Sequence, residues 1–159
     1  MLNAKFVDFA GFQMPIQYQG IILEHNYVRN SVGIFDVSHM GQFKISGSNA
    51  KDFIQKITSN DINKLTPGKA QYSLLINFDG KIVDDLIIYH LDDYYLMVVN
   101  ASNIEKNESW ILGQIDQGVI FENLSDEMGL IAVQGPKSRS VLQNLFPEIL
   151  NLKIGRAHV

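Results

Sequence analysis

Two apolar segments on either side of the dipeptide Asp79-Gly80 constrain the fold of this chain more than any other feature of its sequence. Residues 72–77 and 81–90 both have the length and composition of a β-strand. An Asp-Gly pair between two such runs is typical of a two-residue type I′ turn. Strands joined by so short a turn must run antiparallel, so the sequence predicts a β-hairpin in this part of the chain.

The second predicted strand carries two adjacent carboxylates, Asp84 and Asp85, within its apolar run. Because neighbouring residues of a strand point to opposite faces, these two side chains lie on different sides of the sheet. Both faces are otherwise apolar, and we expect both to be covered. The faces are formed by Ile82, Leu86 and Ile88 beside Asp84, and by Val83, Ile87 and Tyr89 beside Asp85. A buried carboxylate must be paired, hydrogen-bonded or protonated, which makes this pair a candidate site.

The predicted hairpin also places an aromatic ring beside one of the carboxylates. A two-residue turn pairs Leu74 with Asp85 and Tyr72 with Ile87, so that Tyr72 lies diagonal to Asp85 on the same face. A ring for stacking next to an acceptor for N–H groups suits the binding of a heterocycle. From spacing alone the alternative remains that Asp85 pairs with a Lys or Arg and that Tyr72 only packs.

Helix-like and strand-like segments follow one another along the rest of the chain, but few strands are joined by helices in strict alternation. Ser102 and Glu105 match a capping box at the start of one helix, and Pro136 suits the first turn of another. Helices are predicted over residues 20–30, 49–57, 102–117 and 135–146, and further strands over 34–37, 42–46, 94–100, 119–124 and 129–134. The predicted fold class is therefore α+β, with mainly antiparallel sheets and flanking helices.

The composition restricts the chemistry that this chain can carry out. None of its 159 residues is a cysteine, which excludes disulfides, thiolate metal sites and cysteine nucleophiles. With 13 Lys and Arg against 17 Asp and Glu its net charge is −4, opposite to that of a general nucleic-acid binder. No apolar run reaches the ~18 residues of a membrane helix, and the N-terminal residues resemble no signal or transit peptide. We expect no nucleic-acid partner, no membrane partner and a cytoplasmic location.

Standard motifs for metal, phosphate or nucleophile chemistry are absent from the sequence. The four histidines are scattered without metal-ligand spacing, and no metal site is expected. Asp36, Ser38 and His39 lie close together in sequence, whereas the members of a hydrolytic triad come from distant segments. We expect a turn between two strands there. Asn100 follows a strand and precedes a helix, where it could be a loop residue, a helix cap or a polar group of a pocket.

Eight short blocks occur in a characteristic order along the chain. They are residues 6–12 (FVDFAGF), 14–15 (MP), 33–41 (GIFDVSHMG), 60–61 (ND), 68–73 (GKAQYS), 80–86 (GKIVDDL), 98–101 (VVNA) and 131–136 (IAVQGP). Over roughly residues 6–146 the chain resembles the N-terminal part of the T protein family of the glycine cleavage system, the aminomethyltransferases. Folate-dependent domains of dimethylglycine and sarcosine dehydrogenases, and of an iron–sulfur assembly factor, share several of the blocks.

The resemblance implies a fold with three domains around a central folate channel, in proteins more than twice as long as this chain. It implies that residues 1–45 are the N-terminal part of a discontinuous first domain. Residues 46–134 would form an inserted antiparallel α+β domain, and residues 135–159 would begin the return to the first domain, where the chain is truncated. The chain is therefore expected to be an N-terminal fragment.

The activity that the resemblance implies is tetrahydrofolate-dependent aminomethyl transfer in glycine catabolism and one-carbon metabolism. The methylene group carried by the aminomethyl-lipoyl H protein moves to tetrahydrofolate, and ammonia is released. Tetrahydrofolate and the lipoylated H protein are thus the expected cofactor and partner. The resemblance assigns the catalytic role to Asp85, which would hydrogen-bond the folate near its reacting nitrogens. It assigns cofactor contacts to Met40, Tyr72, Ile87, Val98 and Asn100.

Two alternative functions remain open at the level of sequence. The first is a folate-binding, non-catalytic relative of the iron–sulfur assembly factor type. The second is an inactive folded fragment, because the segments that supply the other folate contacts of the family lie outside this chain.

Overall fold

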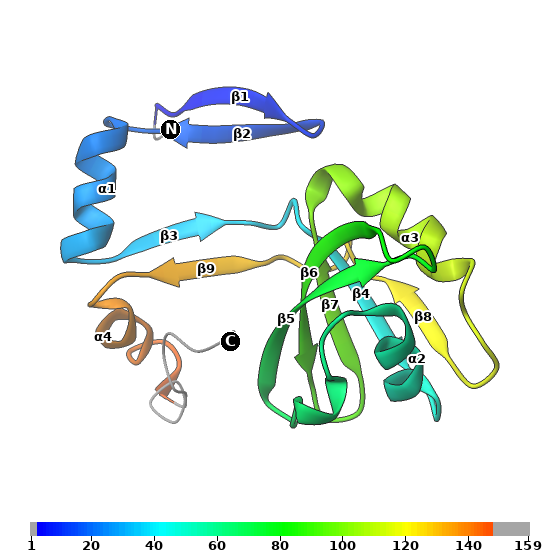
Figure 1. Cartoon of the computed structure of the whole chain (residues 1–159). Coiled ribbons are helices and arrows are strands. Elements are labelled where there is room, and N and C mark those ends of the chain that lie inside the picture. Colours follow the sequence, from blue (N-terminus) through cyan, green and yellow to red (C-terminus); the bar gives the residue numbers. More distant parts are fainter. Residues whose placement is uncertain (1–2, 148–159) are drawn as a thin grey trace. The chain divides into compact units, whose positions relative to one another are not determined.

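The structure is a computed structural model that describes residues 3–147 (Figure 1). The described chain divides into two compact units, the first formed by residues 3–39 and 130–147 and the second by residues 40–129. The chain therefore leaves the first unit after His39 and re-enters it at Leu130.

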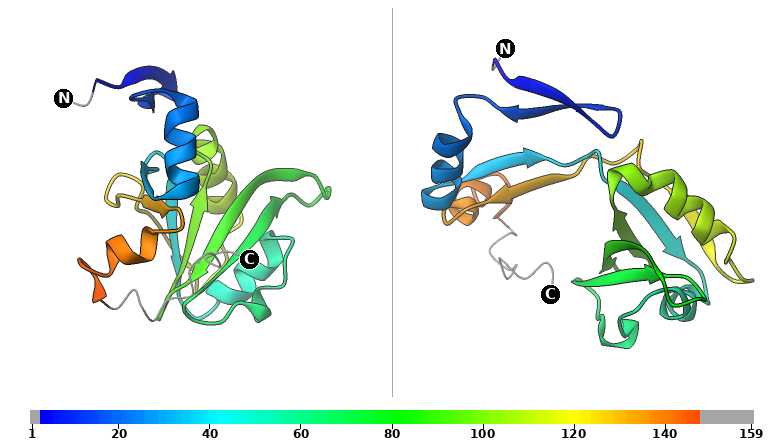
Figure 2. Two further views of the ribbon diagram at one scale, coloured as in Figure 1. Left: turned by 90° about the vertical axis from the view of Figure 1, so that its left-hand side faces the viewer. Right: turned by 45° about the horizontal axis from the view of Figure 1, so that its top comes forward.

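The second unit is built on a five-stranded sheet with the order β5-β6-β7-β4-β8, in which every pair of neighbours is antiparallel. Its strands are β4 (Gly41–Ser46), β5 (Lys69–Ile76), β6 (Ile82–His90), β7 (Tyr95–Val99) and β8 (Ile120–Asn123). The unit also contains α2 (Ala50–Ile57), α3 (Ile104–Leu112) and 3-10 helices at Ile62–Lys64 and Ala101–Asn103. Figure 2 shows the curved strands β5 and β6 from two further sides. The predicted α+β class with mainly antiparallel sheets is confirmed.

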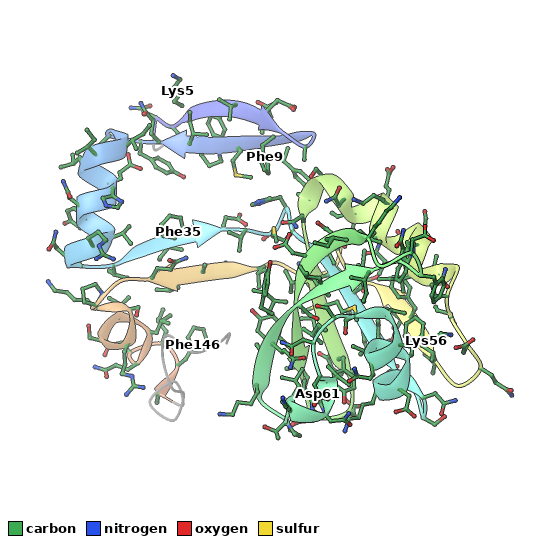
Figure 3. All side chains as sticks on the ribbon, viewed as in Figure 1. Lys5, Phe9, Phe35, Lys56, Asp61 and Phe146 are labelled. Carbon is green, nitrogen blue, oxygen red and sulfur yellow. The ribbon has the colours of Figure 1, made fainter. Side chains whose placement is uncertain are left out.

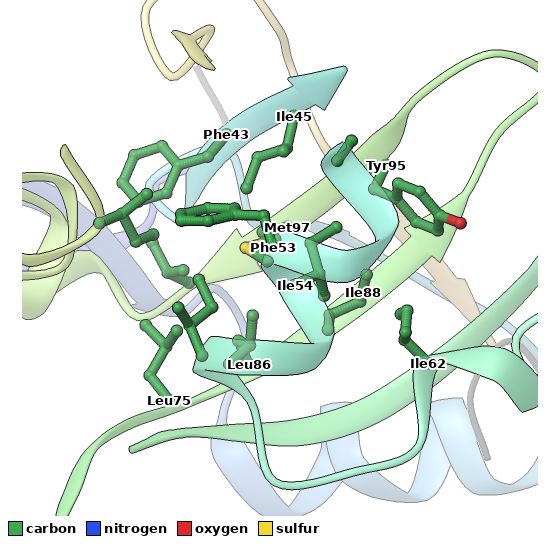
Figure 4. Packing of buried hydrophobic residues seen from close by; sticks show 14 of the residues in the cluster. Phe43, Ile45, Phe53, Ile54, Ile62, Leu75, Leu86, Ile88, Tyr95 and Met97 are labelled. Carbon is green, nitrogen blue, oxygen red and sulfur yellow. The ribbon is translucent and has the colours of Figure 1, made fainter. Parts of the chain in front are cut away.

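One face of this sheet packs against the helices and forms the hydrophobic core (Figure 4). The apolar stripe predicted for α2 is confirmed, because all four of its members are buried: Ala50, Phe53, Ile54 and Ile57. The strands contribute alternate residues to the same core: Phe43, Ile45, Leu75, Leu86, Ile88, Tyr95, Met97 and Val99. The other face of β5, β6 and β7 points away from this core.

The β5-β6 hairpin has the predicted register but a different turn. Leu74 pairs with Asp85 and Tyr72 pairs with Ile87, as predicted. The prediction of a two-residue turn is wrong, because the backbone N–H of Asn77 donates to the carbonyl of Lys81 and leaves three residues in the loop. The side-chain oxygen of Asn77 accepts hydrogen bonds from the backbone of Asp79 and Lys81 and stabilises this longer turn.

A bulge at Val83 compensates for the extra loop residue. Ile76 pairs with Ile82 and Leu75 pairs with Asp84, so Val83 has no partner across the hairpin. The bulge turns Val83 towards the core and leaves Ile82 64% exposed. The faces predicted for these two residues are therefore wrong, whereas those of Asp84 and its successors are correct.

The first unit consists of two small antiparallel sheets and two helices. Its elements are β1 (Lys5–Phe9) with β2 (Phe12–Gln17), α1 (Ile21–Asn30), β3 (Gly33–Asp36) with β9 (Ile131–Gln134), and α4 (Ser138–Leu142). The β1-β2 hairpin was not predicted. Its turn at Ala10 and Gly11 has φ values of 52° and 83°, as a two-residue type I′ turn requires. Every residue of β1 is exposed, so burial imposes no alternating apolar pattern on its sequence.

Two helices are shorter than the sequence predicts. The capping box is wrong: Ser102 lies inside a 3-10 turn, and α3 begins after Asn103 without a side-chain cap. The Asn103 amide donates instead to the Asp84 carboxylate. The last helix, predicted over residues 135–146, is confined to Ser138–Leu142.

Replacing Gly80 by alanine is expected to lower the free energy of unfolding by about 1–2 kcal/mol. Gly80 has a φ of +77°, and a Cβ added there would meet no atom within 4 Å, so the cost is backbone strain alone. Urea unfolding followed by the fluorescence of Trp110, which packs against the core, measures the loss. Gly113→Ala is the matched control, because Gly113 has a φ of −67° and should tolerate alanine. Equal losses in both variants would contradict the assigned strain.

Candidate functional site

Asp84 is a buried carboxylate on the core face of β6, with 7% of its surface exposed. Three asparagine amides surround it. Nδ2 of Asn100 and of Asn103 donate to its Oδ1 at 3.0 and 2.9 Å, and Nδ2 of Asn107 donates to its Oδ2 at 2.6 Å. None of the ion pairs among the described residues includes Asp84. Its negative charge is therefore held by neutral amide donors.

These amides decide the protonation state of Asp84. Burial alone would raise the pKa of the carboxyl group, but the hydrogen bonds from Asn107, Asn100 and Asn103 outweigh it and hold the pKa of Asp84 below its usual range. Asn107 is completely buried, and within residues 3–147 its Oδ1 has no hydrogen-bond partner. The Asp84 carboxylate is thus the acceptor that orients the Asn107 side chain, and it is ionised near neutral pH.

The opposite face of β6 carries Asp85, whose side chain is exposed. Tyr72 Oη donates to Asp85 Oδ2 at 3.2 Å, and Asn100 Nδ2 donates to Asp85 Oδ1 at 2.9 Å. Partial burial raises the pKa of Tyr72, and the hydrogen bond to Asp85 raises it further by a smaller amount. The phenol therefore stays protonated at neutral pH and remains the donor to Asp85.

Two expectations for this face need correction. The expectation that both faces of β6 are covered is wrong for the described residues, because Tyr72 is 51% exposed and Asp85 is exposed as well. The alternative that Asp85 pairs with a Lys or Arg is not what the structure shows, since none of the ion pairs among residues 3–147 includes Asp85.

Three of the predicted contact residues form a row across the sheet beside Asp85. Tyr72 pairs with Ile87, and Ile87 pairs in turn with Val98. Directly paired residues share a face of the sheet, so these side chains lie together on the side away from the core. Tyr72 is half-exposed, Ile87 is half-buried and Val98 is buried. Asp85 therefore lies beside an apolar row whose most exposed member is the aromatic ring of Tyr72.

Asn100 and Met40 lie at the ends of neighbouring strands. Asn100 directly follows β7, and Met40 directly precedes β4, whose first residue Gly41 pairs with Val99. Met40 is half-buried. Asn100 precedes a 3-10 helix but makes no side-chain cap there. Its amide reaches both aspartates of β6, and it therefore links the buried carboxylate with the exposed one.

Sequence reasoning missed Asn103 and Asn107. Together with Asn100 they are spaced three and four residues apart, which is the spacing of side chains on one face of a helix. Three amides at this spacing around the start of a predicted helix, together with a carboxylate on the apolar side of a strand, are a signal from which this cluster could have been predicted.

The segment Asp36–His39 forms no catalytic triad. Asp36 Oδ1 accepts from the backbone of Ser38 at 3.0 Å, and Ser38 Oγ accepts from the backbone N–H of Leu130 at 2.9 Å. The His39 ring packs edge-on against Phe9, with a centroid distance of 5.8 Å. The hydroxyl and the imidazole are thus engaged in different contacts, and the segment is the turn after β3 that the sequence predicts.

A large hollow of about 1130 Å³ lies within the first unit, between β2, α1, β3 and residues 134–136. Its walls are mostly apolar and include Phe35, which is labelled in Figure 3. None of the predicted site residues lines it. Its carboxylates are engaged locally: Glu24 accepts from three backbone N–H groups at 2.6 to 2.9 Å, and Asp36 accepts from Ser38.

Within residues 3–147 no group of three or more His, Asp or Glu side chains is placed to hold a metal ion. The same described residues contain no helix with the length and apolar character needed to cross a membrane.

Comparison with known proteins connects this chain to one family. The family model described as the GCVT N-terminal domain matches residues 1–154. The aminomethyltransferase of Chloroherpeton thalassium is 56% identical over 146 residues, and that of Flavobacterium psychrophilum is 57% identical over 145 residues. Each alignment covers 91% of this chain and 40% of the relative.

A solved structure shows the same fold. The glycine cleavage system aminomethyltransferase T from Bartonella henselae matches with a TM-score of 0.84 and 33% sequence identity. The match covers 90% of this chain and 40% of that chain. The present chain therefore spans about 40% of the length of the relatives it matches.

The stability of the second unit is expected to depend on the ionisation of Asp84. The ordinary pKa of an unfolded aspartate is about 3.9, and the folded value lies below it, so the contribution is complete above about pH 5 and is lost as the pH falls through the unfolded and then the folded value. Asp84→Asn should lower the free energy of unfolding by about 1–3 kcal/mol at pH 7. Urea titrations should show this difference shrinking towards about pH 3. A difference independent of pH would contradict the ionised state.

Proposed function

Because the chain belongs to the GCVT N-terminal domain family, we propose that it is the N-terminal part of a tetrahydrofolate-dependent aminomethyltransferase of the glycine cleavage system. The reaction moves the methylene group of an aminomethyl-lipoyl H protein to tetrahydrofolate, with release of ammonia. The relatives named aminomethyltransferase and the T protein of Bartonella henselae support this proposal. The lipoylated H protein is the proposed partner, and the cytoplasm is the proposed location, which the cysteine-free composition favours.

The observation that carries the proposal is the convergence of Asp85, Tyr72 and Asn100 on one open face. A reduced pterin is a flat heterocycle with several N–H groups, so it needs an aromatic or apolar wall and hydrogen-bond acceptors. Tyr72 offers the exposed ring, and Asp85 offers carboxylate oxygens. Within residues 3–147 no hydrogen bond is made to Asn100 Oδ1, so this oxygen remains a further acceptor. The residues present therefore fit the ligand.

Each residue has a role in this proposal. Asp85 accepts a hydrogen bond from an N–H group of the ligand and so keeps that proton near the reacting nitrogen. Tyr72 and Ile87 form the wall beside it. Val98 and Met40 extend the apolar lining, and Asn100 fixes the edge of the ring. Tetrahydrofolate, when bound, supplies the nitrogen that takes up the one-carbon unit.

The domain division expected from the family is part of the same proposal. Residues 1–45 would belong to a discontinuous first domain, residues 46–134 to an inserted domain, and the residues from 135 onwards to the first domain again. No observation favours the non-catalytic folate-binding alternative, because the matched relatives carry the name aminomethyltransferase.

Removal of the Asp85 carboxylate should abolish most of the transfer activity. The test uses a chimera in which this chain replaces the matching 145-residue part of the Flavobacterium psychrophilum protein. Asp85→Ala should lower kcat by about 100-fold or more, because the ligand loses its principal acceptor, while the melting temperature stays unchanged. Asp92→Ala, which removes an exposed carboxylate elsewhere in the second unit, is the matched control and should retain activity. Near-normal turnover by the Asp85 variant would refute the assigned role.

The 159-residue chain by itself should bind tetrahydrofolate weakly. Tyr72 is 51% exposed, so the described residues cover a pterin ring on one side only. We expect a Kd of about 1 mM or weaker by isothermal titration calorimetry. Micromolar binding would show that residues 1–159 already hold all the contacts that matter.

A further inference from the structure

Asn100 lies between two carboxylates that point to opposite faces of β6. Its Nδ2 is 3.0 Å from Asp84 Oδ1 and 2.9 Å from Asp85 Oδ1. A carboxylate accepts hydrogen bonds, and an asparagine side chain donates them from its nitrogen alone. The nitrogen end of Asn100 must therefore face both aspartates, and its Oδ1 must face away from them.

Asn100 Nδ2 also donates to the backbone carbonyl of Asp85 at 3.2 Å, but that bond and the bond to Asp85 Oδ1 are exposed, so the part-buried contact with Asp84 contributes most to holding this orientation. Asp85 is exposed, so water can replace the amide at its Oδ1. Asp84 is 7% exposed, and its oxygens are enclosed by the amides of Asn100, Asn103 and Asn107. Turning Asn100 around would direct its Oδ1 at a buried carboxylate and remove a part-buried hydrogen bond, which is unfavourable.

Apolar packing of the core does not by itself call for a carboxylate at this position. Leu86 and Ile88, the next two residues on the same face of β6, are buried hydrophobic side chains. A hydrophobic residue at position 84 would avoid the desolvation of a charge, but it would leave the amides of Asn103 and Asn107 without their acceptor. The carboxylate and the amides around it therefore act as one unit, and that unit includes Asn100.

We propose that Asp84 is a positioning residue, which fixes the Asp85 carboxylate by orienting the side chain of Asn100. Asp85 then receives a fixed N–H group at Oδ1 and the Tyr72 phenol at Oδ2, so its plane is defined before a ligand arrives. The same orientation presents Asn100 Oδ1 as an acceptor, which selects ligands with an N–H donor at that edge. This inference rests on the proposed function, because it takes Asp85 as the group that meets the ligand.

The test measures the χ1 rotamer of Asp85 in the 159-residue chain at neutral pH, from three-bond couplings in nuclear magnetic resonance. The unsubstituted chain should show a single rotamer. Asp84→Ala should show rotamer averaging at Asp85, because Asn100 loses its buried anchor. The measurement needs neither ligand nor turnover, so its failure would leave the proposed function untouched, and a failure of the proposed function would leave this result standing.

Two further variants separate positioning from a general loss of structure. Asn100→Ala removes the amide that joins the two aspartates, and it should cause the same χ1 averaging at Asp85 as Asp84→Ala. It provides the test if Asp84→Ala does not fold. Asn103→Ala is the matched control, because it removes another amide from Asp84 Oδ1 without touching Asp85. A single Asp85 rotamer in the folded Asp84 or Asn100 variant would overturn the proposal. So would an averaged Asp85 in the unsubstituted chain, or equal averaging in Asn103→Ala.

Discussion

The buried charge of Asp84 is the constraint on which the second unit depends. A carboxylate on the apolar side of a sheet is tolerated only when donors surround it, and here α3 and the turn before it supply three amides. The donors are 16 to 23 residues from Asp84 in the sequence, so the cluster ties the helix to the sheet. Asn103 directly precedes α3 and Asn107 is its fourth residue, so both lie at the helix end where the positive end of the dipole also favours an anion. The surroundings of the exposed Asp85 depend on this cluster through Asn100, whose amide bonds to both aspartates.

The register of the β5-β6 hairpin decides which carboxylate is buried. A three-residue loop alone would shift every later pair by one residue and would exchange the two faces of β6. The bulge at Val83 restores the pairing from Leu75 and Asp84 onwards. Tyr72 therefore meets Asp85 on the exposed face, and Asp84 meets the amides of Asn100, Asn103 and Asn107. The extra loop residue and the bulge each shift the register by one residue, and the two shifts cancel. The arrangement that the proposed chemistry needs is thereby preserved.

Some of this architecture could be predicted from the sequence, and physical reasons separate it from the rest. The stripe of α2 follows from the helical period, which a buried core enforces. The pairing of Tyr72 with Ile87 was predicted from a two-residue turn, and it holds because the bulge at Val83 offsets the longer loop. The capping box failed because Asn103 donates to Asp84, a partner that local sequence does not reveal. The β1-β2 hairpin was missed because its exposed residues carry no such period. A strand pattern also shows that a face is apolar without showing what covers it, which is why both faces of β6 were expected to be covered.

The most direct test of this account is a crystal structure of the chimeric aminomethyltransferase with tetrahydrofolate bound. The account predicts ring N–H groups within hydrogen-bond distance of an Asp85 carboxylate oxygen and of Asn100 Oδ1, with Tyr72 against the ring and Asp84 still enclosed by its three amides. A pterin ring bound elsewhere, or an Asp85 side chain turned away from both Tyr72 and the ligand, would contradict it.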